Sequence, residues 1–173
     1  MILLLAGPIA AGKTTVASSL AGRTGVQVLR VREELAARLG VNTRDRSTMQ
    51  AAGRDLDTET QGRWLADSIA ARNPGAAGVI VDSLRTPLQA RPILERFDGS
   101  VLIYLDADER TRRSRYQLGA VADPMKASAD FSAALAHETE TLVRSLEPLA
   151  RLSVDTSNLS VDQVVDRILK EAS

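Results

Sequence analysis

The sequence has no cysteine, one histidine and few aromatic residues, and each deficit removes a class of function. Without cysteine the chain forms neither disulfides nor thiolate metal sites, and one histidine, His137, makes no metal cluster and no catalytic triad. Aromatic residues make up 3% of the chain, which is too few for a surface that stacks the bases of single-stranded nucleic acid. Disulfides, thiolate metal sites and a base-stacking surface for single-stranded nucleic acid are therefore excluded.

Net charge is also absent, since 22 lysine and arginine residues are balanced by 22 aspartate and glutamate residues. A neutral chain lacks the long-range positive field that attracts nucleic acid or an anionic membrane surface. Lysine in particular is scarce, and arginine carries most of the positive charge; the lysines are Lys13, Lys126 and Lys170. The balance still permits a local cluster of arginines.

No hydrophobic run approaches the roughly 18 residues that a membrane-spanning helix needs. The N-terminal run Ile2–Ala6 has no charged region before it and is broken by Gly7-Pro8, which argues against a secretory signal. We therefore expect a cytoplasmic protein without a membrane partner. Composition does not decide between a monomer and a homodimer.

With 173 residues, 44% of them hydrophobic, the chain has room for one α/β domain with a sizeable core. Short hydrophobic runs alternate with longer amphipathic stretches. They predict five strands, over Ile2–Ala6, Val26–Arg30, Gly78–Asp82, Val101–Asp106 and Arg151–Asp155. Because the hydrophobic residues of each run are consecutive, we expect these strands to be buried on both faces of a parallel sheet.

The stretches between these runs predict helices that cover both faces of the sheet. Gly40 is expected to end the second helix, and Ser160 with Gln163 has the spacing of a capping box before the last one. The third helix is expected to break at Asp57-Thr58. The predicted helices are Thr14–Arg23, Val31–Leu39, Thr48–Arg72, Pro87–Phe97, Asp108–Gln117, Asp130–Leu146 and Val161–Lys170, in a single domain over residues 1–173.

Residues 7–14, Gly-Pro-Ile-Ala-Ala-Gly-Lys-Thr, fit the pattern G-x-x-x-x-G-K-[ST] in full, between a predicted strand and a predicted helix. In this motif backbone N–H groups wrap a phosphate, and glycines permit backbone angles and a close approach that a side chain would block. Lys13 would bridge the β- and γ-phosphates of ATP, and the Thr14 hydroxyl would ligate Mg²⁺. The residues predicted to bind this cofactor are Gly7, Ala10, Ala11, Gly12, Lys13, Thr14 and Thr15.

A carboxylate, Asp82, ends the predicted strand Gly78–Asp82. Open α/β sheets bind ligands at the carboxyl ends of their strands. At that edge Asp82 would hold Mg²⁺ together with Thr14, or accept a proton from an acceptor hydroxyl. The alternative is a carboxylate that only caps the turn after the strand.

The pattern at residues 7–14 is that of a P-loop, which also occurs in GTPases and in AAA-type motors. Both of these classes fit the chain less well. The sequence contains no N-K-x-D motif, which argues against a GTPase. It is also too short for the additional helical subdomain of an AAA-type motor.

These features resemble the nucleoside monophosphate kinase-like P-loop kinases, the group of adenylate kinase, deoxynucleotide monophosphate kinase and dephospho-CoA kinase. The resemblance rests, in chain order, on residues 7–14, Asp82-Ser83-Leu84-Arg85, Arg112, Arg115 and Val154-Asp155-Thr156-Ser157. It implies a P-loop NTPase fold, a three-layer α/β/α sandwich whose five parallel strands have the order 2-3-1-4-5. It also implies acceptor-binding helices at about 31–72 and a short lid at about 112–129.

On the acceptor side the resemblance implies that Arg85 holds a phosphate group. Residues 85–90, Arg-Thr-Pro-Leu-Gln-Ala, are similar to the R-T-x-x-Q-A of adenylate kinases, so Gln89 would contact the acceptor base. The alternative for Gln89 is an exposed place in the first turn of a helix. Arg32 and Arg54 fall in the acceptor region, and guanidinium groups bind phosphate bidentately without losing charge. Solvated helix faces are the alternative for both.

On the donor side, Arg112 and Arg115 lie three residues apart, on one face of a predicted helix. In the family such arginines cover the donor nucleotide when the lid closes, which excludes water and stabilises the transferred phosphoryl group. Arg115 is thereby added to the ATP contacts. The residues predicted to be catalytic are Lys13, Asp82, Arg112 and Arg115.

The resulting hypothesis is an ATP-dependent phosphotransferase that moves the γ-phosphoryl group of Mg·ATP to a nucleotide-type acceptor, a (deoxy)nucleoside monophosphate in the first place. Two alternatives remain open. Residues 43–45 and 49–53, Thr-Arg-Asp and Met-Gln-Ala-Ala-Gly, are similar to phage-type kinases of 5-hydroxymethyluracil, for which DNA is the acceptor. A lid without Arg or Lys over Tyr116–Pro124 would also suit a regulator that binds ATP without transferring phosphate.

Overall fold

Strands from the whole length of the chain form one parallel sheet. A computed structural model describes residues 1–40, 46–72, 78–120, 130–136 and 138–172. The strands are β1 (Ile2–Ala6), β2 (Gln27–Arg30), β3 (Val79–Leu84), β4 (Ser100–Asp106) and β5 (Leu152–Asp155). Their order is β2-β3-β1-β4-β5, and each adjacent pair is parallel, which confirms the predicted sheet.

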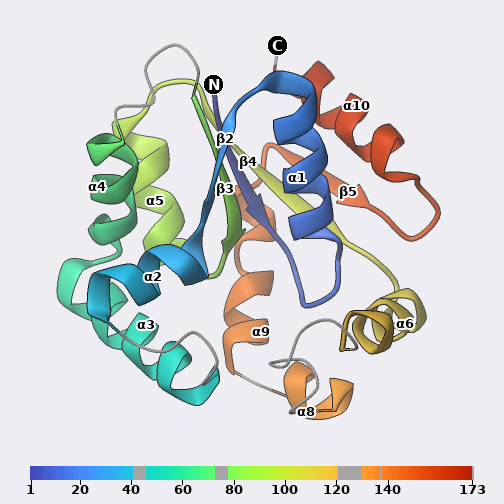
Figure 1. Ribbon diagram of the computed structural model, residues 1–173, viewed down its shortest axis with the longest axis horizontal. Coiled ribbons are helices and arrows are strands. Elements are labelled where there is room, and N and C mark those ends of the chain that lie inside the picture. Colours follow the sequence, from blue (N-terminus) through green and yellow to red (C-terminus); the bar gives the residue numbers. More distant parts are fainter. Residues whose placement is uncertain (41–45, 73–77, 121–129, 137, 173) are drawn as a thin grey trace.

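Helices cover both faces of this sheet, so the predicted three-layer sandwich is also confirmed (Figure 1). On one face lie α1 (Lys13–Thr24) and α10 (Val161–Glu171), whose buried residues share a core with alternate residues of β1 and β4. The opposite face is covered by α2 (Val31–Leu39), α3 (Arg46–Thr60), α4 (Arg63–Ala71), α5 (Pro87–Arg96) and α9 (Glu138–Arg144). The remaining short helices are α6 (Glu109–Ala120), α8 (Phe131–Leu135) and the 3₁₀ turn η1 (Glu147–Leu149).

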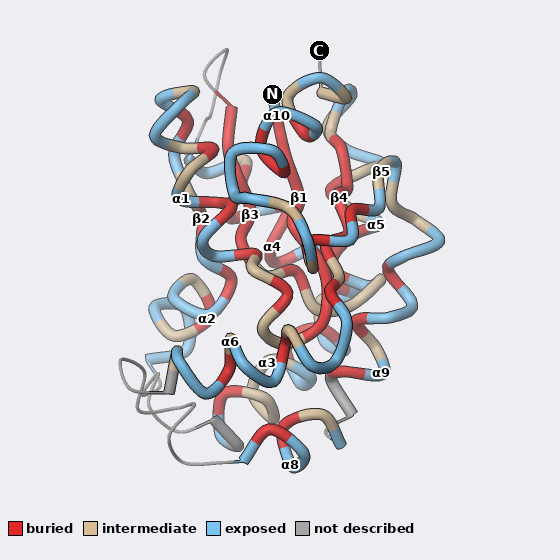
Figure 2. Tube along the Cα trace, turned by 90° about the vertical axis from the view of Figure 1, so that its right-hand side faces the viewer, coloured by how far each residue is buried: buried red, intermediate tan, exposed pale blue. Residues whose placement is uncertain are grey.

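The central strand β1 explains why the hydrophobic runs are continuous. Its side chains alternate between the two cores, with Leu3 and Leu5 on the α1 side and Leu4 on the α4 side, all fully buried. The prediction of burial on both faces is wrong for the edge strands, because β2 and β5 each have a neighbour on one side only. Leu29 is the one buried residue of β2 and Val154 the one buried residue of β5, whereas the central strand β1 is buried along its length (Figure 2).

Two predicted helix ends are confirmed, and the predicted break in the third helix lies at a different residue. Gly40 ends α2 with a left-handed φ of 64°, and Ser160 with Gln163 forms the predicted capping box of α10. The third helix breaks after Thr60, and not at Asp57-Thr58, because Gln61 and Gly62 adopt positive φ values of 52° and 72°. The predicted helix Asp130–Leu146 is described as α8 and α9.

The described part of the predicted lid, residues 112–120, belongs to α6. The rest of the lid, residues 121–129 with Lys126, lies outside the described residues, as do His137 and residues 43–45. Within the described ranges, no helix has the length and apolar character of a membrane span. The carboxyl ends of all five strands lie at one edge of the sheet, where residues 7–12 connect β1 to α1 (Figure 1). That edge carries the candidate site.

Candidate functional site

Residues 7–14 have the strand–loop–helix context that their sequence pattern requires. β1 ends at Ala6 and α1 begins at Lys13. Positive φ values occur at Gly7 (139°), Ala10 (62°) and Gly12 (94°). Such residues among ordinary ones turn successive N–H groups toward one side, and the start of α1 adds the positive end of its helix dipole. The loop therefore has the backbone form of an anion site.

Gly7 is fixed by packing as well as by its backbone angle. A Cβ atom at this position would lie 1.9 Å from the backbone oxygen of Leu105 in β4. A Cβ atom at Gly12 would have Nη1 of Arg115 as its nearest neighbour, at 3.9 Å. The first glycine of the motif thus lets the loop rest on β4, and the second leaves room near an arginine.

The ammonium group of Lys13 is folded back onto the loop. Its Nζ donates hydrogen bonds to the carbonyl oxygens of Gly7 at 2.8 Å and Pro8 at 2.7 Å, and the residue is buried. Thr14 and Thr15, in the first turn of α1, are exposed. The positive charge and the accessible hydroxyl groups therefore lie at the same end of α1, as the motif predicts.

Asp82 lies in β3, which pairs directly with β1 beside the loop. It is buried, at 3% exposure, and its Oδ1 accepts a hydrogen bond from Ser83 Oγ at 2.9 Å. Mg²⁺ in nucleotide sites is held by one or two protein oxygens together with substrate phosphates, and not by an all-protein cage. That the Thr14 hydroxyl and the Asp82 carboxylate form such a donor pair stays a prediction.

Ser83 is a site residue that sequence reasoning missed. Its φ of 72° is left-handed, which is unfavourable for a residue with a Cβ. The pairing register shifts there, because Leu5 faces Asp82 while Ala6 faces Leu84. Ser83 is therefore the extra residue of a bulge that turns the end of β3 beside the loop. A serine at a strand end carries no sequence signal for this conformation.

Arg115 is anchored above the loop by the segment after β5. Its Nη1 and Nη2 donate to the hydroxyl and the carbonyl oxygen of Thr156, both at 2.8 Å. The Thr156 hydroxyl, which has one hydrogen to donate, lies within hydrogen-bond distance of two carbonyl oxygens, those of Ala11 (3.1 Å) and Asp106 (2.9 Å). One buried threonine thus connects β4, β5, the loop and the predicted ATP-contacting arginine.

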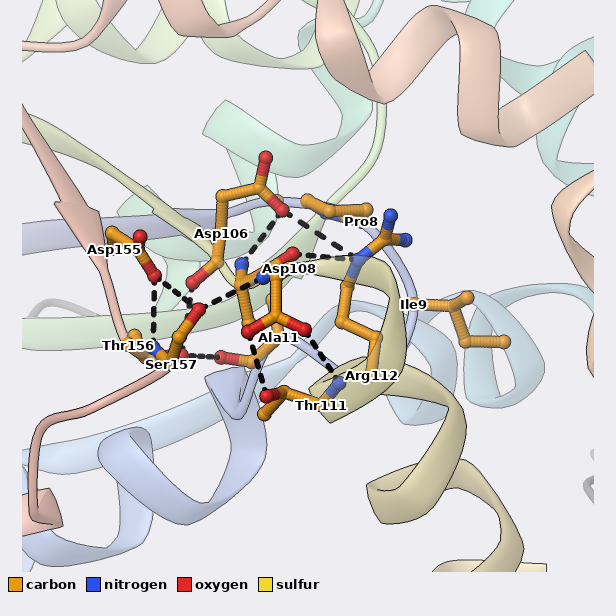
Figure 3. A network of polar contacts seen from close by, with 12 residues as sticks. Pro8, Ile9, Ala11, Asp106, Asp108, Thr111, Arg112, Asp155, Thr156 and Ser157 are labelled. Carbon is orange, nitrogen blue, oxygen red and sulfur yellow. Dashed lines mark hydrogen bonds and ion pairs between the residues drawn. The ribbon is translucent and has the colours of Figure 1, made fainter.

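Two carboxylates stabilise the turns beside this threonine (Figure 3). Hydrogen bonds from the backbone and side chain of Thr111 lower the pKa of Asp108, and hydrogen bonds from Ser157 lower the pKa of Asp155. The Ser157 hydroxyl also accepts from the N–H of Asp108 at 2.8 Å, so the two turns are tied together. The motif Val154-Asp155-Thr156-Ser157 spans the end of β5, and the hydrogen bonds from Ser157 to Asp155 stabilise the turn there.

Arg112 lies in a buried position beside the loop, with 4% exposure. Its Nε donates to the Ala107 carbonyl at 2.9 Å and lies 3.7 Å from Asp106 Oδ1 (Figure 3). Its guanidinium carbon is 6.0 Å from the ring centroid of Phe131, and its buried Nη1 has no hydrogen-bond partner among the described residues. This arginine is anchored in the protein, and its catalytic role stays a prediction.

The predicted acceptor arginines occupy three different elements. Arg32 is exposed on α2 and Arg54 is exposed on α3. Arg85 follows β3 and is partly exposed, with its Nη1 3.9 Å from Oε1 of the buried Glu140. Their convergence on one acceptor group stays a prediction.

Gln89 is buried and not exposed in the first turn of α5. Its Nε2 donates to both carboxylate oxygens of Asp57, and its Oε1 accepts from the backbone N–H of Arg85 at 3.0 Å. Both ends of the amide are therefore engaged within the protein. This geometry favours a structural role for Gln89 over contact with an acceptor base.

Asp57 is the centre of that buried network. Its carboxylate also accepts from Trp64 Nε1 at 2.7 Å and from Thr86 Oγ1 at 3.1 Å. Burial raises the pKa of Asp57, and the hydrogen bonds from Trp64, Gln89 and Thr86 oppose this shift. The network joins α3, α4 and α5 and holds the backbone at Arg85. The sequence predicted only that a helix breaks at Asp57, and no buried role for its carboxylate.

The fold and the loop together define a P-loop α/β protein. The sequence matches the AAA domain family over residues 3–130, and the chain belongs to that family. The match includes the loop, Asp82 and both predicted lid arginines. Membership of the narrower nucleoside monophosphate kinase-like group stays a prediction, as does the lack of an AAA motor's helical subdomain.

Solved structures of small kinases share this fold. Shikimate kinase from Acinetobacter baumannii, in complex with shikimate, is 20% identical with a TM-score of 0.63, and the match covers 98% of this chain and 90% of that one. Shikimate kinase from Aquifex aeolicus is 16% identical with a TM-score of 0.62, covering 99% and 95%. A gluconokinase from Sinorhizobium meliloti is 16% identical with a TM-score of 0.61, covering 98% and 90%. No curated protein matches the sequence.

Proposed function

We propose that the protein is an ATP-dependent kinase that transfers the γ-phosphoryl group of Mg·ATP to a small-molecule acceptor. The observation that carries this proposal is the arrangement around the loop. Lys13 lies against the loop carbonyls, Thr14 is exposed beside it, and Asp82 lies in the adjacent strand β3, two residues before its end. The shared fold of the shikimate kinases and gluconokinase supports it.

In this mechanism the protein acts by positioning and by fixed charge. The loop N–H groups bind the donor phosphates, and Lys13 exchanges its two carbonyl partners for phosphate oxygens. Thr14 and Asp82 would hold Mg²⁺, which neutralises phosphate charge when it is bound. Arg115, fixed by Thr156, adds a positive charge that cannot titrate.

The finer proposal concerns the acceptor, for which we infer a (deoxy)nucleoside monophosphate. Its support is the arginine content of the acceptor side, at Arg32, Arg54 and Arg85, since guanidinium groups suit a phosphate dianion. The buried position of Gln89 removes the argument from base contact. A phosphate acceptor requires no strong base.

A hydroxyl acceptor is the second candidate, and the names of the shikimate kinases and the gluconokinase favour it. Asp82 would then accept the hydroxyl proton while the hydroxyl oxygen bonds to the γ-phosphorus, and the bond from that phosphorus to the leaving ADP breaks. 5-Hydroxymethyluracil in DNA belongs to this class of acceptor. A regulator that holds ATP without transfer is the alternative from another class.

ADP formation from Mg·ATP, measured with nucleoside monophosphates, small hydroxy acids, sugars and 5-hydroxymethyluracil DNA, tests the proposal. We expect turnover with a nucleoside monophosphate, and its loss with retained folding in Lys13→Ala. Lys170→Ala, which removes an exposed lysine from α10, should remain active. ATP binding without turnover on any acceptor would favour the regulator. Full turnover of Lys13→Ala would contradict the loop assignment.

A further inference from the structure

A buried carboxylate from α9 contacts the phosphate-binding loop. Glu140 Oε2 accepts a hydrogen bond from the backbone N–H of Ile9 at 2.8 Å, although the two residues are 131 positions apart. Glu140 is 4% exposed. A buried carboxylate is costly unless nearby charges and donors compensate it, so its location requires an explanation.

The second carboxylate oxygen faces an arginine at a distance too long for a hydrogen bond. Glu140 Oε1 is buried and has no hydrogen-bond partner among the described residues. Arg85 Nη1 lies 3.9 Å from it, and the side chain of Arg85 is 40% exposed. The guanidinium group of Arg85 is thus the nearby positive charge on one side of Glu140, while part of the arginine still faces solvent.

Helices α6 and α8 hold the same part of the loop by packing. The side chains of Ile9 and Ala10 pack against a cluster of Tyr116, Phe131 and Ala134, from α6 and α8. Tyr116 and Phe131 have ring centroids 5.5 Å apart. Ile9 is therefore fixed through its side chain by this cluster and through its N–H by Glu140. Packing of Ile9 and Ala10 thus holds the loop in place where it contacts Glu140.

We propose that Glu140 is a positioning residue that couples Arg85 to the phosphate-binding loop. This inference rests on the proposed function, which assigns the loop to the donor phosphates. Glu140 brings a negative charge to a loop N–H, and the positive charge of Arg85 offsets it. When an anionic acceptor group binds Arg85, that compensation weakens and the loop becomes less favourable for the donor phosphates. The two sites thus influence each other's affinity.

A double-mutant cycle on nucleotide binding tests this coupling without any need for the acceptor's identity. The readout is the Kd of a non-hydrolysable ATP analogue with Mg²⁺, measured by calorimetry on the full chain. Arg85→Ala leaves the Glu140 charge without its partner, so we expect Kd to rise about fivefold. Glu140→Gln keeps the side-chain shape and an acceptor for Ile9 but removes the charge, so Kd should fall. In the Glu140→Gln background, Arg85→Ala should change Kd by less than about twofold.

The controls separate this inference from the proposed function and from misfolding. Glu147→Gln removes a negative charge from an exposed residue of η1, and we expect it to leave the effect of Arg85→Ala unchanged. Hydrogen exchange of the Ile9 amide should be faster in Glu140→Ala than in Glu140→Gln, with both variants folded by thermal melting. If Arg85→Ala has the same effect in both backgrounds, the coupling is wrong. If the wild-type protein binds no nucleotide, the proposed function itself fails.

Discussion

The side-chain amide of Gln89 donates to both oxygens of the Asp57 carboxylate, at 3.1 and 3.0 Å, in the interior between α3 and α5. The two residues lie 32 positions apart in the chain. The Oε1 of Gln89 also accepts a hydrogen bond from the backbone N–H of Arg85, so the pair fixes the backbone at that residue. The buried pair thus connects the helices predicted to receive the acceptor with the strand end that carries Asp82.

Gln89→Ala should lower the free energy of unfolding by about 1–3 kcal/mol, because it removes one of the donors to the buried Asp57 carboxylate and leaves the Arg85 N–H without the acceptor Oε1 of Gln89. Denaturant titration measures this loss. Asp57→Asn should cost a similar amount, and the double variant should cost less than the sum, since the residues share one network. Among nucleoside monophosphates, the order of preference should be the same in Gln89→Ala as in the wild type. A changed base preference without a loss of stability would restore the base-contact interpretation.

Asp57 also makes stability depend on pH. Its pKa in the folded protein is raised above 3.8 by burial, so the folded state binds more protons than the unfolded state between the two pKa values. The contribution of Asp57 is therefore fully present below the unfolded pKa and declines as pH rises through the folded pKa. Denaturant titrations from pH 7 to pH 4 should show the wild type gaining stability relative to Asp57→Asn as pH falls. A parallel pH dependence of the two proteins would contradict the raised pKa.

The motif at residues 7–14 was predictable because its information is local. Eight consecutive residues specify the loop, and the flanking strand and helix follow from hydrophobic periodicity. Asp82 was placed by the general rule that parallel sheets bind ligands at the carboxyl ends of their strands. These features required no knowledge of which distant residues meet.

The pairs Asp57 with Gln89 and Glu140 with Ile9 were not predictable for the opposite reason. Each joins residues that come together only when separate elements pack in the folded chain, and the motifs that contain Gln89 and Ile9 do not specify Asp57 or Glu140 as their partners. Likewise, hydrophobic runs distinguish strands from helices but not central from edge strands, so the exposure of β2 and β5 was missed. The left-handed Ser83 depends on the register shift between β1 and β3, which is again a tertiary property.

Gly7 provides a steric test of the loop. Gly7→Ala places a Cβ atom 1.9 Å from the Leu105 carbonyl oxygen in a backbone conformation of φ 139°, so we expect a loss of about 3 kcal/mol in unfolding free energy. Binding of an ATP analogue should be lost in whatever fraction folds, because the loop must move off β4. Thermal unfolding and calorimetry provide the two measurements.

Gly22→Ala is the matched control for this substitution. Gly22 lies within α1, and a Cβ atom there would contact nothing within 4 Å. The same chemical change should therefore stabilise the protein by about 0.5–1 kcal/mol, because alanine favours the helix more than glycine does. Equal effects of the two substitutions would show that the contact between Gly7 and β4 is not what fixes the loop.

Arg115 provides the sharpest test of the donor side, because a second arginine of α6 serves as its control. Arg115→Ala removes the two hydrogen bonds to Thr156 and a fixed positive charge near Gly12, so the Kd of an ATP analogue should rise about tenfold. Arg113 lies two residues earlier and is exposed, paired with Glu109 at 3.1 Å. Arg113→Ala should change Kd by less than about twofold, as expected for an exposed ion pair. Equal losses in both variants would mean that α6 contributes only general positive charge, and that the anchorage of Arg115 by Thr156 has no part in nucleotide binding.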